Sequence, residues 1–149
     1  MTTDQDKTKE EAQIRGLVEN WVAAFRVKDL EKLMTLYAPD VLVFDLAPPL
    51  QISGTDTHRK NWKEWFAGIE GPIGYEVRDL KITTGDGAAF SHSLNRITLQ
   101  KTSGEKADLW LRVTVGYHKI DGRWLVTHEH VSVPFYMDGS FKAAVDLQP

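Results

Sequence analysis

The hydrophobic pattern of the chain changes at the glycine- and proline-containing stretch "EGPIG" (residues 70–74). Before this stretch, apolar residues mostly recur every three or four positions, which is typical of helices; after it, they alternate with polar residues, which is typical of strands. We predict helices over residues 10–27, 29–37 and 55–69, with a first strand over 41–46. Four further strands are predicted over 75–84, 88–100, 107–119 and 123–133, with a bulge at Arg78–Asp79.

Short turns join the predicted later strands, and "IDGR" (120–123) contains Asp-Gly, the strongest local signal for a hairpin. Helices followed by hairpin-connected strands predict an α+β fold, in which three N-terminal helices pack on one face of a curved antiparallel sheet. The 149 residues are enough for one domain with its own core. We expect residues 1–9 to form a flexible N-terminus, 10–133 the domain and 134–149 a C-terminal tail.

The composition excludes several classes of function. The chain has no Cys, so thiol nucleophiles, disulfides and thiolate metal sites are absent. Its net charge is −3 and its Lys and Arg residues are scattered, so we expect neither nucleic acid nor a membrane as a partner. The polar start of the sequence is unlike a signal peptide, and no apolar stretch is long enough to span a membrane. These features favour a soluble cytoplasmic protein.

Two segments resemble known proteins. The stretch "DLEKLMTLYAPDVLVFD" (29–45), followed by Ser53-Gly54 and a helix, resembles the start of ketosteroid isomerase. The stretch "DGRWLVTHEHVS" (121–132) is similar to SnoaL-like domains and to the association domain of calcium/calmodulin-dependent kinase II. All belong to the nuclear transport factor 2-like superfamily, and the resemblance covers residues 10–133. It implies a cone-shaped curved sheet closed by helices, a pocket inside the cone and a homodimer built on the outer sheet face.

The resemblance assigns roles to single residues. Asp45 occupies the position of the general base of ketosteroid isomerase. The isomerase also uses two hydrogen-bond donors to its oxyanion. Trp21 takes the place of the first, and the second falls at Val115 or Gly116, whose side chains cannot donate. Because such donors usually supply the largest part of the catalysis, the resemblance implies a base but not the same steroid reaction.

The run "LVTHEHVSVP" (125–134) raises the question of which face each residue occupies, because side chains alternate along a strand. The resemblance implies that Glu129 points into the pocket and that His128 and His130 point outward. It implies the following further inward residues: Thr127 and Val131 on the last strand, Val113, Val115 and Tyr117 on the strand before it, and Phe90, His92, Leu94 and Arg96 on strand 88–100. It places Trp124 outward. A shift of one residue would reverse any of these sets.

The inward residues suggest an acid/base pocket. Asp45 would be the base, His92 or Glu129 would pass the proton on, and Trp21 or Tyr117 would donate a hydrogen bond to a carbonyl group. Such a carboxylate needs a pKa raised by an apolar wall. The predicted wall and its polar members are Val43, Phe66, Phe90, Val115, Thr127 and Arg96.

Each of these residues also has a structural interpretation. Asp45 could cap the "APPL" loop, and Glu129 could be the buried partner of Arg96 or Arg78. His92 could be a core histidine, and the three tryptophans Trp21, Trp62 and Trp65 could be core residues and not a ligand cage.

A metal site would need His118 beside His128 and His130. In a cupin, a His-x-His pair comes early and a second His motif follows it, whereas this chain has no His after His130. Two histidines separated by one residue on a strand more often form hydrogen bonds across an interface than bind a metal. We expect no metal and no cofactor. The favoured function is therefore a small isomerase or cyclase that moves a proton on a compact apolar carbonyl compound. The alternative is a non-catalytic ligand-binding or dimerisation module.

Overall fold

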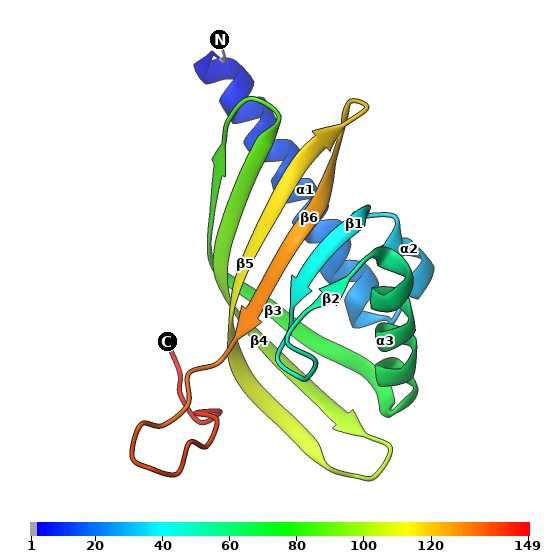
Figure 1. Ribbon diagram of the computed structural model, residues 1–149, viewed down its shortest axis with the longest axis vertical. Coiled ribbons are helices and arrows are strands. Elements are labelled where there is room, and N and C mark those ends of the chain that lie inside the picture. The colour runs from blue at the N-terminus through cyan, green and yellow to red at the C-terminus, as the bar shows by residue number, and fades with distance from the viewer. Residues whose placement is uncertain (1–2) are drawn as a thin grey trace.

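Three helices pack on one six-stranded sheet in the computed structural model, which describes residues 3–149 (Figure 1). The helices are α1 (Asp4–Arg26), α2 (Leu30–Met34) and α3 (Thr55–Ala67). The strands are β1 (Tyr37–Phe44), β2 (Ile52–Ser53), β3 (Ile69–Thr84), β4 (Ala88–Lys101), β5 (Lys106–Ile120) and β6 (Arg123–Ser132). Their order is β2-β1-β6-β5-β4-β3, and only the β1–β6 pair is parallel within residues 3–149. The predicted α+β fold is confirmed.

The long strands β3, β4 and β5 bend strongly along their length and wrap the sheet around the helices (Figure 1). Helix α1 contacts β3 and β6, and α3 contacts β1, β2 and β3, so both helices cover the same, concave side. Apolar residues of α1 such as Ile14 and Phe25 are buried there, in one hydrophobic core with Val126 and Ile97 of the sheet. The space between this layer of helices and the sheet is where a ligand could be enclosed.

The predicted start of the first helix at residue 10 is wrong: helix α1 begins six residues earlier, at Asp4. Thr3 caps it: the Thr3 hydroxyl oxygen accepts a hydrogen bond from the Asp6 N–H at 3.1 Å, and the Asp6 carboxylate accepts one from the Thr3 N–H at 3.3 Å. Such a capping box stabilises a helix start without any apolar residue. Residues 4–9 of the expected flexible N-terminus are therefore helical, and Met1 and Thr2 lie outside the described residues.

The second helix ends at Met34, so Tyr37 is not its last residue, as predicted, but the first residue of β1. The cause is pairing with β6: the Val126 N–H donates to the Leu36 carbonyl at 2.9 Å, and Tyr37 is in register with Val126. Extended backbone at this point turns the Tyr37 side chain into the interior, where it is 4% exposed.

Two bulges set which residues face inward. The predicted bulge at Arg78–Asp79 is confirmed by a register shift between Arg78 and Lys81 of β3. A second, unpredicted bulge leaves Thr127 without a partner between the pairs Gly116–His128 and Tyr117–Val126. Since a bulge reverses the alternation, Trp124 lies on the buried side, and its predicted outward position is wrong.

The tail 134–149 lies beyond the end of β6, away from the helices (Figure 1). It folds back on itself through a bridge between Phe135 and Ala143. None of the helices in residues 3–149 combines the length and the apolar content that crossing a membrane requires.

Candidate functional site

A cavity of about 320 Å³ lies between the helices and the sheet. Its helical wall is aromatic, with Trp21 and Phe25 from α1 and Trp62 and Trp65 from α3. Its sheet wall is aliphatic, and residues 45–48, which follow β1, form one end. The remaining lining residues are Ile52, His58, Asn61, Tyr75, Ile97, Leu111, Val113, Glu129 and Val131.

A smaller cavity of about 50 Å³ adjoins the large one. Trp21, Tyr75, Val113 and Glu129 line both, so we call the place where these four residues lie the junction. The small cavity has more polar walls on the sheet side, because β4 contributes Ser91, Ser93 and Asn95 and β5 contributes Tyr117. Its other lining residues are Leu17, Val18, Val22, Val77, Leu80, Val115 and Val126.

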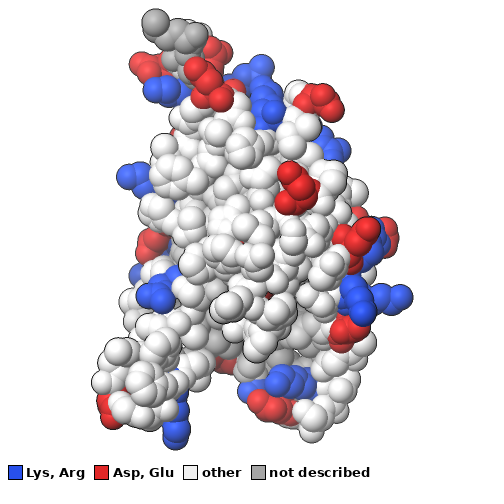
Figure 2. Space-filling model, viewed as in Figure 1, with Lys and Arg blue, Asp and Glu red and all other residues white. Residues whose placement is uncertain are grey.

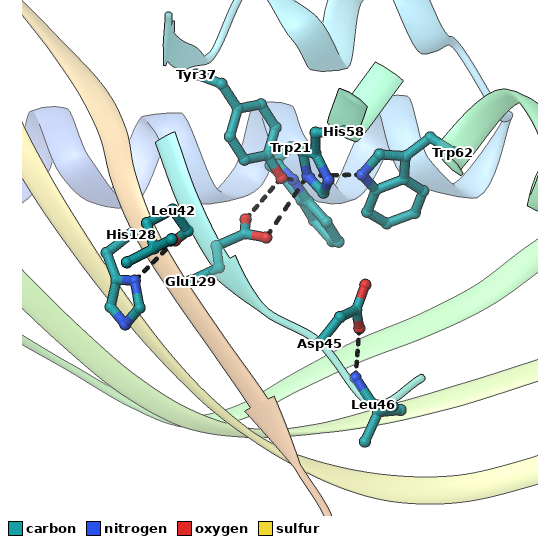
Figure 3. A network of polar contacts seen from close by, with 9 residues as sticks. All are labelled: Trp21, Tyr37, Leu42, Asp45, Leu46, His58, Trp62, His128 and Glu129. Atoms are coloured by element: carbon teal, nitrogen blue, oxygen red, sulfur yellow. Dashed lines mark hydrogen bonds and ion pairs between the residues drawn. The ribbon is translucent and has the colours of Figure 1, made fainter. Parts of the chain in front are cut away.

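Glu129 ends a chain of hydrogen bonds at the junction (Figure 3). The Trp21 indole N–H donates to the Tyr37 hydroxyl oxygen at 2.7 Å, and the Tyr37 O–H donates to Glu129 Oε1 at 2.6 Å. Burial raises the pKa of Glu129 to about 7, against the lowering effect of the Tyr37 hydrogen bond, and the negative charge of Asp45 raises it further. This carboxyl group can therefore gain or lose a proton near neutral pH.

His58 lies beside Glu129 but does not neutralise it. The Trp62 indole N–H donates to His58 Nε2 at 2.7 Å, and the same nitrogen lies 3.9 Å from Glu129 Oε2 (Figure 3). Burial lowers the pKa of His58 to about 4, so its ring is neutral at pH 7 and its proton is on Nδ1. His58 and Glu129 therefore do not form an ion pair at pH 7, and the buried Glu129 carboxylate has no cationic partner at this position.

Asp45 follows the last residue of β1 and lies at the exposed end of the large cavity. Its carboxylate accepts a hydrogen bond from the Leu46 N–H at 2.7 Å, and its charge acts on Glu129 (Figure 3). The structure therefore brings Asp45, Glu129 and Trp21 to one cavity. Two other predicted residues, Tyr117 and Val115, line the small cavity.

The predicted inward set on strand 88–100 is wrong by one residue. Phe90 is 48% exposed, His92 is exposed, and Arg96 forms a hydrogen-bonded ion pair with Asp108 at 2.8 Å. Ser93 is in register with Val113, and directly paired residues share a face, so Ser91, Ser93 and Asn95 point inward. Leu94, like the other three, is on the outer face. The alternation of apolar and polar residues along β4 predicted the wrong face because the residues of β4 that face the interior are polar.

Three further predicted pocket residues do not line either cavity. Val43 and Phe66 are packed in the hydrophobic core. Thr127 lies at the bulge, where its hydroxyl donates to the Gly116 carbonyl at 3.3 Å and lies 2.9 Å from His118 Nδ1.

Tyr37 and His58 are site residues that the sequence does not predict as such. Tyr37 falls at the end of a predicted helix, and its partner Glu129 is 92 residues away, so no local signal reveals the pair. His58 could have been found, because it precedes Trp62 by four residues and so shares its helix face.

Each of the three histidines considered for a metal site has a different environment. His128 Nδ1 is 2.7 Å from the Leu42 carbonyl, His118 contacts Thr127, and His130 is exposed beside Phe44. Within residues 3–149, no three His, Asp or Glu side chains converge in a way that would hold a metal ion.

The sequence model of the SnoaL-like domain family matches residues 14–136, which is most of the chain. The chain belongs to this family. Its SnoaL-like fold is similar to that of an NTF2-like protein of unknown function from Pseudomonas putida KT2440, with 34% identity over 95% of this chain and 98% of the other, and a TM-score of 0.87. Among curated proteins, none matches the sequence significantly.

Two more distant structures share the fold of this SnoaL-like chain. One is a ketosteroid isomerase-like protein from Erwinia carotovora atroseptica SCRI1043, with 19% identity over 81% of this chain and 93% of the other, and a TM-score of 0.71. The other is the association domain of CaMKII from C. elegans, with 18% identity over 87% and 99% and a TM-score of 0.68. At these identities the likeness concerns the fold alone.

Proposed function

We propose that this SnoaL-like protein binds a small, neutral, largely apolar carbonyl compound in the large cavity and moves a proton on it, as isomerases and cyclases do. The observation that carries the proposal is Glu129, a buried carboxyl group at the junction whose pKa is raised to about 7. A perturbed carboxyl group inside a cavity is a common mark of an acid/base site.

The cavity walls favour a neutral ligand. Among residues 3–149, no Lys or Arg lines either cavity, while Asp45 and Glu129 are both acidic. An anionic ligand would be repelled by these carboxylates and would find no cation to replace its water. The aromatic wall of α1 and α3 suits a flat apolar body.

The proposed step needs a base and a carbonyl group, and we propose no cofactor for it. Glu129 Oε1 is engaged by Tyr37, so Oε2 would take the proton from the carbon next to the carbonyl group. The electron pair of the broken C–H bond then forms the carbon–carbon double bond of an enolate, and the negative charge moves to the oxygen. In a substrate with a β,γ carbon–carbon double bond, this enolate is a dienolate; return of the proton to its γ-carbon re-forms the carbonyl group, leaves the double bond between the α- and β-carbons and completes an isomerisation. This proposal moves the role of base from Asp45 to Glu129.

A general probe tests the base without knowledge of the natural substrate. In 5-nitrobenzisoxazole, removal of the ring C–H proton by a base forms a nitrile, breaks the N–O bond and releases a coloured phenolate. We expect catalysis that rises with pH and levels off above about 7, because Glu129 must be deprotonated. Glu129→Gln should lower the rate by about 100-fold or more.

His92→Gln is the matched control, since His92 lies on the outer face and its substitution should leave the rate unchanged. Asp45→Asn separates the two carboxylates. With Glu129 as base, this variant keeps the reaction and moves the midpoint of its pH profile to lower pH, because the charge that raises the Glu129 pKa is removed. Loss of the reaction in Asp45→Asn with full activity in Glu129→Gln would assign the base to Asp45.

A non-catalytic binding module is the second candidate. The Trp21 N–H and the Tyr37 O–H both donate within the protein, which leaves fewer donors for a developing oxyanion. Tight binding of a neutral aromatic compound without any elimination of the probe would favour this candidate.

We also propose a homodimer through the outer face of the sheet. Helices α1 and α3 contact the other side, and the outer face carries Phe90, Leu94 and Trp110. Exposed apolar side chains on this face are suited to contact with a second copy of the chain. Figure 2 shows one side of the molecule, on which charged residues lie mostly along the margins.

A further inference from the structure

The hydroxyl group of Tyr75 has one hydrogen bond and one unused proton. Asn95 Nδ2 donates to Tyr75 Oη at 2.7 Å, and Asn95 Oδ1 accepts from the Ser93 hydroxyl at 2.8 Å. The Ser93 hydroxyl donates to Oδ1, so the Asn95 amide presents its N–H to Tyr75 and fills an acceptor position of the Tyr75 oxygen. Within residues 3–149, the Tyr75 hydroxyl donates to no acceptor, so its proton is available to a bound molecule.

Tyr37 differs from Tyr75 in this respect, because its proton goes to Glu129. The Tyr117 hydroxyl lies 2.8 Å from the Ser91 hydroxyl, and either of the two can be the donor of the hydrogen bond between them. Tyr75 lies at the junction, where it lines both cavities together with Glu129. Its side chain is the one at the junction that is both buried and left with a donor.

The surroundings keep the Tyr75 proton in place. Burial raises the pKa of Tyr75 well above its usual value; the Asn95 hydrogen bond opposes this, and the charges of Glu129 and Asp45 add to it. The hydroxyl therefore remains a donor throughout the neutral range. The small cavity beside it, at about 50 Å³, has room for a carbonyl oxygen or a few water molecules.

We propose that the small cavity is a subsite for one acceptor oxygen of the ligand, and that the Tyr75 hydroxyl, oriented by Asn95 and Ser93, donates a hydrogen bond to that oxygen. The ligand class is then a flat, neutral ketone or aldehyde, with its apolar body against the aromatic wall of the large cavity and its oxygen at the junction. This inference rests on the proposed function only for the carbonyl class of the ligand, and it names a donor that the resemblance to ketosteroid isomerase does not supply.

Two probes of equal shape test the subsite. They are 2-acetylnaphthalene and 2-isopropenylnaphthalene, in which a methylene group replaces the carbonyl oxygen. We expect the protein to bind the ketone roughly tenfold more tightly than the alkene, as judged by quenching of tryptophan fluorescence. In Tyr75→Phe the two affinities should come within about twofold of one another. Tyr136→Phe is the matched control: Tyr136 lies on the C-terminal tail, where its hydroxyl donates to Asp146, and its substitution should keep the preference of the wild-type protein.

The carbonyl stretching band of the bound ketone gives a second readout. It should lie at lower frequency in the wild-type protein than in a hydrocarbon solvent, and it should return toward the hydrocarbon value in Tyr75→Phe. Ser93→Ala retains Tyr75 but releases the Asn95 amide, which can then turn and accept the Tyr75 proton. This variant should therefore lose most of the band shift, and it tests the proposal even when Tyr75→Phe does not fold.

Equal binding of ketone and alkene to the wild-type protein, or a band shift that survives in both Tyr75→Phe and Ser93→Ala, overturns the inference. A different result would contradict the proposed function and leave this inference intact. A ketone preference that depends on Tyr75, together with no Glu129-dependent elimination of 5-nitrobenzisoxazole, would keep the subsite and remove the base.

Discussion

At the scale of single residues, the site contains two buried groups whose effects on stability oppose one another. Burial raises the pKa of Glu129 from 4.5 to about 7 and lowers that of His58 from 6.5 to about 4. Between pH 4.5 and 7, the unfolded chain has lost the Glu129 proton that the folded protein still holds, so this group lowers stability as pH rises. Between pH 4 and 6.5, the unfolded chain holds a His58 proton that the folded protein lacks, so this group raises stability as pH rises.

Each effect is about 3 kcal/mol over its range, and the two nearly cancel in the wild-type protein. We predict that Glu129→Gln exposes the His58 effect, so that the free energy of unfolding rises by about 3 kcal/mol more than in the wild-type protein between pH 4 and 6.5. His58→Asn should expose the Glu129 effect, a comparable fall between pH 4.5 and 7. Urea unfolding at several pH values measures both.

Substitution of an exposed histidine provides the control for this prediction. His92→Gln should give a curve of stability against pH that runs parallel to that of the wild-type protein, because His92 lies on the outer face. A Glu129→Gln curve that is also parallel would contradict the raised pKa of Glu129.

At the scale of elements, sequence patterns predicted most of the strands but failed on the face of β4 and on the face of Trp124 at the start of β6. The ends of β4, β5 and β6 lie within about one residue of the predicted ranges, because alternation and turn residues are local signals. The face of β4 is set instead by pairing with β5, where Ser93 is opposite Val113. Ser91, Ser93 and Asn95 are polar because they line a cavity, so a rule that places apolar residues inside selects the opposite face.

The bulge of β3 leads to a prediction about Asp79. This residue has φ of 56°, in the left-handed region, which Asp and Asn tolerate better than branched residues. Asp79→Val should lower the free energy of unfolding by about 1–2 kcal/mol, while Asp79→Gly should leave it unchanged or raise it slightly. Thermal and urea unfolding of the two variants measure the difference. Equal stability of Asp79→Val and the wild-type protein would mean that the strain is absent.

At the scale of the whole molecule, the fold was easier to predict than the site. The order of three helical segments and a series of strands is written in hydrophobic periods that extend over the chain. The site depends on contacts between distant segments, such as Tyr37 of β1 with Glu129 of β6 and Tyr75 of β3 with Asn95 of β4. An error of one residue in the predicted face of a strand leaves the predicted fold unchanged. It does exchange pocket residues for surface residues, as His92 and Phe90 show.

The outer face of the sheet, which we propose as a dimer interface, leads to the last prediction. Phe90 is half exposed on this face and is opposite Gly116 of β5, where no side chain covers it. If two copies pack through this face, Phe90→Glu should bury a charge in the interface and raise the dimer dissociation constant by about tenfold or more. Phe141→Glu is the matched control, because Phe141 is 65% exposed but lies on the C-terminal tail. Light scattering after size-exclusion chromatography measures the mass of each. A monomeric wild-type protein contradicts the proposed dimer, and dissociation by Phe141→Glu in place of Phe90→Glu would move the interface to the tail.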